Sequence, residues 1–501
     1  MSLAIIHTRA CIGVEAPAVT VEVHLSGGLP ALHMVGLPDS AVRESRDRVR
    51  SALLNAGFEF PQRRITVNLA PADLPKDGGR FDLAIALGIL VASDQLKTKR
   101  LETFEAIGEL ALSGELRRVT GALPSVCAAT RAGRCVLVPS GNARESGIAE
   151  GARVYPVGDL LSACRVLAAT VLPDGLATNA APPPIKLRLS MNDVIGQHAA
   201  KRALIIAATG GHNVLMMGPP GTGKTMLARR LASLLPALPN NEALEVAAVH
   251  SVAGRSDVLA AFGQRPFRDP HHTASAAALV GGGNPPRPGE VSLAHRGVLF
   301  LDELPEFERR VLEVLREPME SGEAVIARAR MTVRFPARFQ LVAAMNPCPA
   351  GYDCRDATHC RCSPQLAQRY RERLSGPLLD RIDLHVDVPS VPVNALLKRT
   401  AGDDESQIQA NIEAAVAQQI ARAGKLNREL DVREVERFCA PDQAANAFLA
   451  NAAGRLGLSA RGLHRVLRVA RTIADLANDP TVGLTHISEA ISYRKLDRQR
   501  E

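Results

Sequence analysis

The chain has 501 residues, of which 46% are hydrophobic and 22% charged, and a formal net charge of +8. This length suits about three domains, and no apolar run approaches the ~20 residues of a membrane span. Nine cysteines, an odd number in a long chain, and an N-terminus without an export pattern predict a cytoplasmic protein. The positive charge permits a polyanionic partner, whereas the 3% aromatic content argues against base stacking as the main grip on nucleic acid.

Residues 1–168 alternate strand and helix signals and predict a compact α/β or α+β domain. Residues 19–25 and 64–69 alternate apolar and polar side chains, as half-buried strands do. Residues 40–56 are rich in helix formers, and residues 82–92 form an apolar stretch typical of a buried helix.

A Gly- and Pro-rich stretch, residues 169–187, predicts a linker to a second domain, residues 188–392. That domain contains NVLMMGPPGTGKTMLA, an apolar run followed by a glycine turn and a helix opening at Lys224. The turn satisfies the G-x-x-x-x-G-K-[ST] pattern, in which backbone N–H groups and a helix N-terminus surround phosphate. Lys224 can reach the β/γ-phosphates and the Thr225 hydroxyl can ligate Mg²⁺. The predicted nucleotide-binding residues are Gly218, Pro219, Pro220, Gly221, Thr222, Gly223, Lys224 and Thr225.

Short segments on either side of this loop add candidate site residues. Ile195 and Gly196, one helix before the loop, could line an adenine pocket or belong to the core. Asp302 and Glu303 end a buried strand that follows a phosphate loop, which places Asp302 beside Mg²⁺ and lets Glu303 polarise the attacking water. Asn346 ends a third strand and could orient water or contact the γ-phosphate; the alternative is an Asn turn.

Two insertions interrupt this domain. Residues 262–290 form a long loop, and Arg268, His271 and His272 in it could approach a polyanion or a neighbouring subunit. The two histidines are expected to point apart on an extended segment, which argues against a metal site.

The second insertion, residues 324–338, predicts a hairpin. Its basic face carries Arg328, Arg330 and Arg334, which could contact DNA phosphates or belong to an ordinary solvated hairpin.

A cysteine-rich loop and a late arginine complete the candidates. Cys348, Cys354, Cys360 and Cys362 lie within 15 residues and suit tetrahedral Zn²⁺, the alternative being reduced loop thiols. Arg381 lies between an apolar helix end and a strand. It could stabilise charge on a neighbouring subunit's nucleotide, or pair with Asp380 or Asp383.

Residues 393–501 are predicted to be helical. Arginines recur at helical spacing in residues 459–477, and one of them could reach back to the phosphates while the others cover a solvated face.

The phosphate loop, the Asp-Glu strand, the Asn strand and the trailing arginines, in that order, resemble an AAA+ ATPase. PFRDPHHTASAAALVGGGNPPRPGEVSLAHRGVLFLDELPEF and RLSGPLLDRIDLHVDVP look like the magnesium-chelatase-like branch and, within it, the ComM (YifB) competence-protein family. The resemblance spans essentially the whole chain. It implies a Lon-protease-like N-terminal α+β domain, an α/β P-loop core with a parallel sheet and a C-terminal helical lid. It also implies ATP and Mg²⁺ as cofactors and a ring that is expected to be hexameric.

The resemblance also implies roles for matching residues. Residues 218–225 match Walker A, and the two insertions match pore-facing elements of this clade. The remaining matches are Asp302 and Glu303 with Walker B, Asn346 with sensor 1, Arg381 with the arginine finger and Arg461 with the sensor-2 arginine.

The first domain departs from the Lon pattern where chemistry would occur. LPKDGGRFDLAIALGIL is similar to the Lon active-site stretch. Arg80 falls about where the nucleophilic serine would be, and Leu123 falls near the position of its lysine partner. Arginine cannot attack a carbonyl and leucine cannot act as a base, so we expect no proteolysis; the domain is expected to hold DNA or to scaffold the ring.

The resemblance implies a motor that moves single-stranded or branched DNA through its pore. In the ComM family this is a helicase that promotes branch migration of recombination intermediates during natural transformation. The alternative is a metal-chelatase-type motor subunit, which as the family is known lacks the N-terminal domain. An ATP-dependent protease is a further alternative, which the Arg80 position disfavours.

Overall fold

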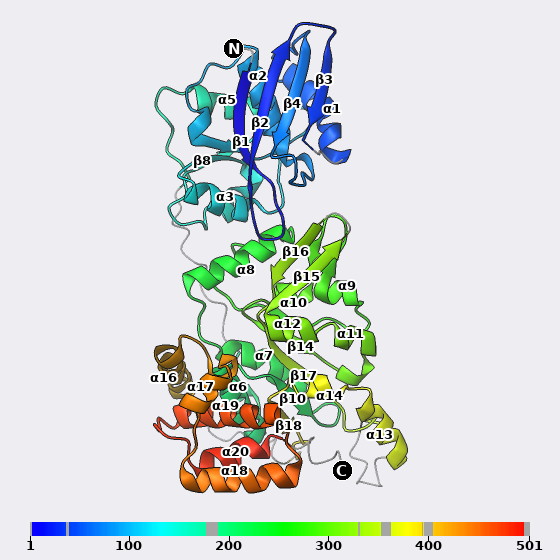
Figure 1. Ribbon diagram of the computed structural model, residues 1–501, viewed down its shortest axis with the longest axis vertical. Coiled ribbons are helices and arrows are strands. Elements are labelled where there is room, and N and C mark those ends of the chain that lie inside the picture. The colour runs from blue at the N-terminus through cyan, green and yellow to red at the C-terminus, as the bar shows by residue number, and fades with distance from the viewer. Residues whose placement is uncertain are drawn as a thin grey trace.

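The computed structural model describes residues 3–36, 40–176, 189–328, 331–351, 362–392, 394 and 404–494. An N-terminal region, a central region and a C-terminal group of helices follow one another along the long axis (Figure 1). In these ranges no helix has both the length and the apolar character needed to cross a bilayer.

The N-terminal region is built on a mixed seven-stranded sheet in the order β3-β4-β2-β1-β5-β8-β9. Its strands are β1 (Leu3–Arg9), β2 (Ala18–Ser26), β3 (Ala31–Val35), β4 (Arg64–Ala70), β5 (Phe104–Ala106), β8 (Cys135–Pro139) and β9 (Val154–Val157), with a separate pair β6 (Glu109–Leu110) and β7 (Leu116–Arg117). Its helices are α1 (Ser40–Asn55), α2 (Asp82–Ala92), α3 (Ala122–Arg131), α4 (Ala143–Ser146) and α5 (Leu160–Ala168). The strands and helices predicted from the sequence in this region are therefore β2, β4, α1 and α2.

Helix α2 forms the centre of this region. Its sequence, DLAIALGILVA, is apolar on every side, and all its residues are buried. It packs on β1 and β2 and contacts α1 and α5, because a helix without a polar face is stable only when it is covered all round. The predicted linker that follows lies largely outside the described residues.

The central region contains a parallel five-stranded sheet in the order β11-β14-β17-β10-β18. These strands are β10 (Val214–Met217), β11 (Phe267–Arg268), β14 (Val298–Leu301), β17 (Gln340–Met345) and β18 (Leu384–Asp387). The helices are α6 (His198–Gly210), α7 (Lys224–Leu234), α8 (Asn240–Val252), α9 (Ala276–Val280), α10 (Glu290–Leu293), α11 (Arg309–Glu313), α12 (Arg316–Ser321), α13 (Pro364–Glu372) and α14 (Gly376–Leu379). Two antiparallel pairs are added, β12 (Gly281–Gly282) with β13 (Arg287–Pro288) and β15 (Glu323–Arg328) with β16 (Met331–Pro336).

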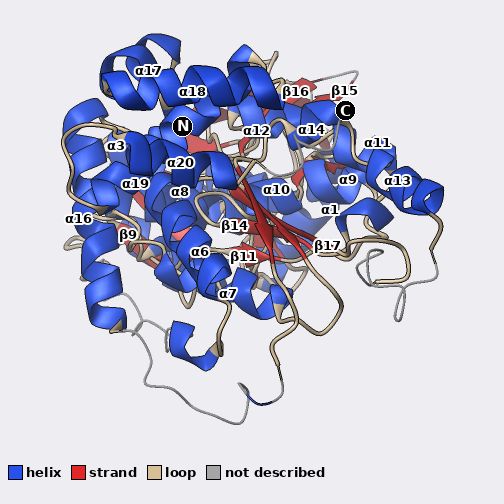
Figure 2. Ribbon diagram, turned by 90° about the horizontal axis from the view of Figure 1, so that it is seen from below, coloured by secondary structure: helices blue, strands red, loops and turns tan. Residues whose placement is uncertain are grey.

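Both faces of this parallel sheet are covered, which explains why its strands read as continuous apolar runs. One set of side chains, including Val214 and Phe300, packs with α6, α7 and the C-terminal helices. The alternate set, including Leu215 and Leu301, packs with α9, α11 and α12. Seen from below, the strands lie inside a shell of helices (Figure 2).

The two predicted insertions differ in outcome. The hairpin at 324–338 is confirmed as β15 and β16. The stretch 262–290, predicted as a loop, instead contains β11, α9, β12 and β13, and β11 is the edge strand of the sheet. A strand of two residues is too short to leave a periodic pattern in the sequence.

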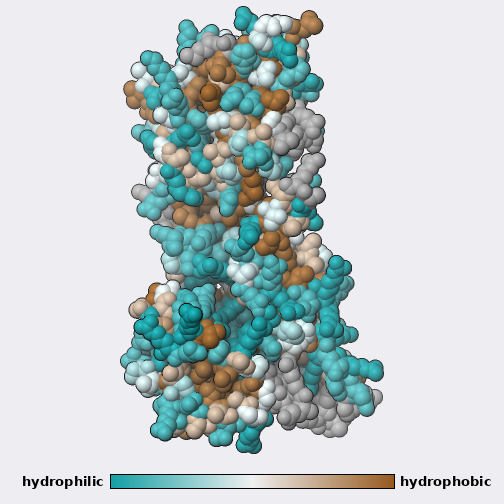
Figure 3. All heavy atoms as spheres, in the orientation of Figure 1, coloured by the Kyte–Doolittle hydropathy of each residue, from teal (hydrophilic) through white to brown (hydrophobic). Residues whose placement is uncertain are grey.

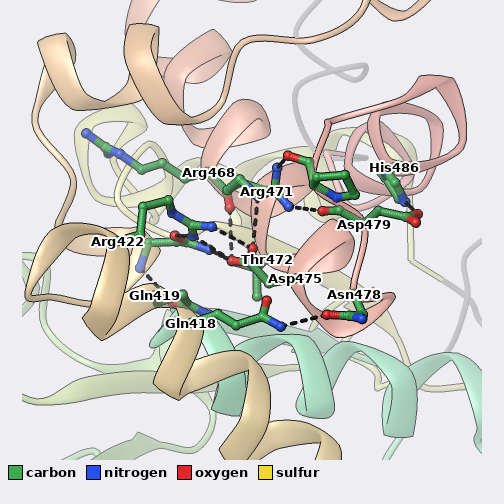
Figure 4. A network of polar contacts seen from close by, with 12 residues as sticks. Gln418, Gln419, Arg422, Arg468, Arg471, Thr472, Asp475, Asn478, Asp479 and His486 are labelled. Atoms are coloured by element: carbon green, nitrogen blue, oxygen red, sulfur yellow. Dashed lines mark hydrogen bonds and ion pairs between the residues drawn. The ribbon is translucent and has the colours of Figure 1, made fainter.

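The C-terminal group consists of α16 (Glu405–Ala423), α17 (Val432–Phe438), α18 (Gln443–Leu456), α19 (Ala460–Leu476) and α20 (Leu484–Ser492). Four of these helices match the prediction. Helices α16 to α19 each begin at a side-chain cap, Asp404, Asp431, Asp442 or Ser459. A buried carboxylate, Asp475, accepts hydrogen bonds from Arg422 and Arg471 and joins α16 to α19 (Figure 4).

The N-terminal region rests on α8 and on the hairpin. The hairpin side chains Ile326, Val333 and Phe335 are buried against Ile12 and Val14 of the loop between β1 and β2. This loop reaches down to the hairpin in Figure 1. At α8, the backbone N–H of Gly121 donates to the carbonyl of Ser251 at 3.1 Å. One face of the hairpin is therefore an intramolecular contact.

Candidate active site

The phosphate-loop pattern lies where β10 ends and α7 begins. Gly218 passes so close to the backbone that an added Cβ would lie 2.1 Å from the carbonyl oxygen of Val388. Gly223 precedes α7 with φ of +86°, a conformation that glycine adopts without strain. The two glycines therefore let the loop curl back over the end of β10, with the free N–H groups of α7 directed into the curl.

The ammonium group of Lys224 lies inside this curl. Its Nζ donates to the carbonyls of Gly218 and Pro219, both at 2.8 Å, and to Oδ1 of Asn346 at 3.2 Å. Burial lowers the pKa of Lys224, and the nearby Asp302 and Glu303 act in the opposite direction. Asn346, predicted from the end of the third strand, thus meets Lys224 directly.

Asp302 and Glu303 follow β14, next to the loop. Thr225 donates its hydroxyl to Oδ2 of Asp302 at 2.9 Å, and the backbone N–H of Glu303 donates to Oδ1 at 2.9 Å. A hydroxyl and a carboxylate at this separation are the oxygen ligands that Mg²⁺ prefers beside phosphates. The residues present therefore fit a magnesium ion between Thr225 and Asp302.

The segment proposed for the adenine lies beside the same loop. Gln197 donates its side-chain amide to the carbonyl of Pro389, and a Cβ added at Gly196 would lie 3.8 Å from the Val391 side chain. Val388 of the same segment touches Gly218. Ile195 is half-buried. Residues 388–391 thus form one wall shared by the loop and by the Ile195–Gly196 segment.

The paired histidines of the first insertion do not behave as predicted. The rings of His271 and His272 lie 4.1 Å apart rather than pointing in opposite directions. His272 places Nδ1 at 3.2 Å from Oε2 of Glu303, so it lies beside the candidate nucleotide site. Arg268 is held by both oxygens of Glu290, at 2.6 and 2.8 Å. The predicted DNA contact at Arg268 would therefore have to compete with an existing ion pair.

The hairpin arginines face solvent to different degrees. Arg334 is exposed and pairs with Glu323 at 3.2 Å across the two strands. Arg328 is exposed at the end of β15, and Arg330 lies outside the described residues. The face drawn in Figure 3 is mixed, with hydrophobic patches among hydrophilic ones from the N-terminal region down to the C-terminal helices.

Arg381 lies at the opposite end of the sheet from the loop. Asn213, just before β10, donates its amide to the carbonyl of Arg381 at 2.8 Å, whereas Lys224 follows the carboxyl end of that strand. About 16 Å of extended chain separates Asn213 from Gly218. The Arg381 side chain is buried and pairs with Glu320 on α12. Asp383, one of the two alternative partners predicted from the sequence, pairs with Arg465 instead.

Asp383 instead joins the sheet to the C-terminal helices. Its carboxylate accepts the N–H of Asn213 at 2.9 Å and pairs with Arg465 of α19 at 3.0 Å. Burial raises the pKa of Asp383, but His212, Arg465 and the nearby Arg428 outweigh burial and hold it well below the usual range.

Arg461 is exposed one helical turn before Arg465. In the described chain the structure records no hydrogen bond or ion pair between Arg461 and the phosphate loop, so its predicted role is not visible within one chain.

The cysteine loop is only partly described. Cys348 is buried and packs with Cys362 and Ala367, while Cys354 and Cys360 lie outside the described residues. Among the residues that are described, no group of three His, Cys, Asp or Glu side chains could hold a metal ion. Zinc is therefore not supported by the described part of the loop.

The two positions matched to the Lon dyad lie near one another in the N-terminal region. Arg80 is buried, donates to the carbonyl of Thr120 and lies beside Gly121, at the start of α3. Leu123 on α3 is fully buried. A guanidinium bonded to backbone and a buried leucine offer neither a nucleophile nor a base.

Three family models and several curated relatives match the chain. Models of the magnesium chelatase subunit ChlI match residues 190–396 and 21–142, and a model of its C-terminal part matches residues 402–494. The chain is 50% identical to the competence protein ComM of Haemophilus influenzae over 506 residues, 99% of this chain and 98% of the relative. It is 50% identical over 500 residues to the uncharacterized protein YifB of Salmonella typhimurium, with the same coverage. It is 30% identical to the magnesium-chelatase 38 kDa subunit of Rhodobacter capsulatus, over 60% of this chain and 86% of that subunit.

Proposed function

The chain belongs to the magnesium chelatase subunit ChlI family, as a ComM-like member, and on that premise we propose that it is an ATP-hydrolysing motor that acts on DNA. Its parallel sheet and helical C-terminal region fit the AAA+ fold of this family, whose members are of the ATPase type. The resemblance of the N-terminal domain to Lon stays a prediction.

One observation carries the ATPase: Lys224, Thr225, Asp302 and Asn346 come from three separate strand ends and are joined by hydrogen bonds. In this arrangement Lys224 and the N–H groups of α7 bind the β/γ-phosphates. Thr225 and Asp302 would hold Mg²⁺, which would neutralise phosphate charge. Asn346 orients the γ-phosphate or the water, and Glu303 polarises the water for in-line attack.

The arginine needed at the transition state comes from a neighbouring copy. Arg381 lies at the amino end of the sheet and so cannot reach the loop of its own chain, whereas a head-to-tail neighbour presents it to the next loop. This favours a closed ring, with a hexamer as the expected number. Arg461, close to Arg465 at the same end, is proposed to act across the same seam.

The DNA-directed part of the proposal is supported by the net charge, by the exposed Arg328 and Arg334 and by the ComM name of a relative. We infer that the motor is a helicase that promotes branch migration of recombination intermediates in natural transformation. Its cofactors are ATP and Mg²⁺; a structural Zn²⁺ would need Cys354 and Cys360.

The test measures ATP hydrolysis over a dilution series, with and without single-stranded and branched DNA. We expect the rate per subunit to rise with protein concentration and to rise again with DNA. A rate per subunit that is constant on dilution would contradict the shared site. Absence of both DNA binding and stimulation at low salt would contradict the DNA motor.

A chelatase-type motor subunit is the second candidate, favoured by the identity to the Rhodobacter capsulatus subunit and by the ChlI match at residues 21–142. That match weakens the expectation that the N-terminal region separates this chain from the chelatases. ATPase activity stimulated by a tetrapyrrole-binding partner protein, and indifferent to DNA, would favour this candidate.

A further inference from the structure

Both terminal nitrogens of Arg381 are engaged inside its own chain. Nη1 donates to the carbonyl of Pro377 at 2.6 Å, and Nη2 donates to Oε1 of Glu320 on α12. Nε is buried and has no hydrogen-bond partner in the described chain. Because only 9% of the side chain is exposed, these contacts hold the guanidinium against its own chain rather than projecting it toward a neighbour.

Glu320 supplies the counterion that this burial requires. A buried guanidinium without a carboxylate destabilises a fold, because its charge has lost its hydration. Among the described residues, Glu320 is the one carboxylate recorded in an ion pair with Arg381, and 59% of its own side chain is exposed. The pair can therefore open from the Glu320 side without disturbing the core, and the arginine is the partner that is costly to leave unpaired.

The pair lies on the wall of a hollow of about 350 Å³. The lining residues carry three carboxylates, two guanidinium groups and one hydroxyl, and they are Glu313, Glu317, Glu320, Arg316, Arg381 and Ser321. The guanidinium of Arg316 is itself paired with Glu313, at 2.7 Å. Three carboxylates against two guanidinium groups leave an excess negative charge, so an approaching phosphate is repelled unless a carboxylate withdraws.

We propose that Glu320 is a positioning residue that holds Arg381 in the unassembled chain and yields it to the γ-phosphate bound by a neighbouring copy. A phosphate can accept two parallel hydrogen bonds from a guanidinium, whereas Glu320 accepts from Nη2 alone, so the phosphate displaces Glu320 at the seam. Glu320 thereby sets how readily Arg381 is delivered. This inference rests on the proposed function, in which Arg381 serves the nucleotide of another copy, and adds the group that competes for the arginine.

Two opposite effects follow from removing the charge of Glu320. The unassembled chain loses a contact, so the packing of α12 against α14 should become less stable. The assembled protein loses a competitor for Arg381, so its ATP hydrolysis should become faster. A residue with a purely structural role would show the first effect without the second.

The activity test measures kcat and KM for ATP at a protein concentration that saturates assembly. We expect Glu320→Gln to raise kcat about threefold, the effect of losing an ion pair with one exposed partner, and to leave KM unchanged. In an Arg381→Ala background the same substitution should change nothing, because the arginine that Glu320 holds is absent. An unchanged or lowered kcat in Glu320→Gln would overturn the proposal.

Glu317→Gln is the matched control. It removes the same charge from the same hollow, but Glu317 is exposed and the described chain records no contact between its carboxylate and Arg381. Its effect on kcat should therefore be clearly smaller than that of Glu320→Gln. An equal rise in both variants would mean that the charge of the hollow acts as a whole, and would overturn the specific role of Glu320.

The restraint in the unassembled chain is measured without turnover. Hydrogen exchange of residues 376–382 in dilute, nucleotide-free protein should be several-fold faster in Glu320→Gln than in wild type, because α14 loses its link to α12. Arg381→Ala should give a similar acceleration, and the double variant should add little, because the two substitutions remove one shared contact. Fully additive effects would overturn the pairing. If the two effects are coupled but no protein hydrolyses ATP, the restraint stands and the proposed ATPase function fails.

Discussion

The two ends of the five-stranded sheet both carry polar residues, but they differ in whether those residues form a complete site within one chain. At the carboxyl end, Lys224, Thr225, Asp302 and Asn346 are already joined by hydrogen bonds within one chain. At the amino end, Arg381 is buried against Glu320 and faces no nucleotide loop of its own chain. Under the proposed function, the carboxyl end forms the nucleotide site, and the amino end supplies an arginine to the nucleotide of another copy.

This difference separates binding from hydrolysis. Under the proposed function, a monomer would contain the residues that bind phosphate and Mg²⁺ but would lack the arginine that stabilises transition-state charge. Substitutions at the carboxyl end should therefore weaken nucleotide binding or activation of the attacking water. Substitutions at the amino end should leave nucleotide binding unchanged and lower only the hydrolysis rate of the assembled protein.

The largest effect is expected from Lys224→Ala at the carboxyl end of the sheet. Loss of the ammonium group that bridges the loop carbonyls and Asn346 should abolish measurable ATP binding and, with it, hydrolysis. Binding of a fluorescent ATP analogue provides the measurement, with Lys97→Ala, an exposed lysine of the N-terminal region, as the control. Tight binding by Lys224→Ala would place the phosphate site elsewhere.

Arg381→Ala should leave ATP binding unchanged and reduce kcat about 10³-fold in the assembled protein. Arg373→Ala, which removes an exposed arginine paired with Glu306, should retain activity. Glu303→Gln should bind ATP but hydrolyse it poorly. Mixing it with Arg381→Ala should restore activity at seams where an intact loop meets an intact arginine. If no mixture shows any recovery, Arg381 acts within its own chain.

Asp383→Asn tests the buried ion pair that joins the amino end of the sheet to helix α19. Removing the charge leaves Arg465 and Arg428 without their buried counterion, and we expect a loss of about 3–5 kcal/mol in the free energy of unfolding at pH 7. Urea unfolding measures this. Asp442→Asn is the matched control, because asparagine caps α18 as well as aspartate does.

The same carboxylate predicts a pH dependence. The folded-state pKa of Asp383 is held below its usual value, so its stabilising contribution is complete at neutral pH. That contribution is lost as the pH falls below about 4, where the unfolded carboxyl group takes up protons. The stability gap between wild type and Asp383→Asn should narrow in that range. A gap that stays constant down to pH 3 would contradict the sign of the shift.

The smallest effect is expected at the hairpin. Replacing Arg328 and Arg334 together by Ala should weaken DNA binding several-fold and lower the slope of log K against log salt by up to about 2. Fluorescence anisotropy across a salt series measures both quantities, with the exposed Arg455→Ala on α18 as the control. An unchanged slope would show that these hairpin arginines do not contact DNA phosphates.

The sequence alone determined the local part of the site. Residues 218–225 are contiguous, and a glycine turn before a helix N-terminus creates a phosphate cradle by backbone geometry, so no distant contact is needed to recognise it. Apolar runs that end in Asp302, Glu303 and Asn346 were also readable, because parallel strands align their carboxyl ends at one edge. Four of the five C-terminal helices were readable, and the one that was missed, α17, has only seven residues.

Only the tertiary structure decided the rest. The pairing of His272 with Glu303, of Arg381 with Glu320 and of Asp383 with Arg465 joins residues that are 31, 61 and 82 positions apart. No local pattern encodes such pairings, because they depend on how whole elements pack. The edge strand β11 has two residues and is stabilised by β14, not by its own sequence. The covered face of the hairpin likewise became visible only when the N-terminal region was in place.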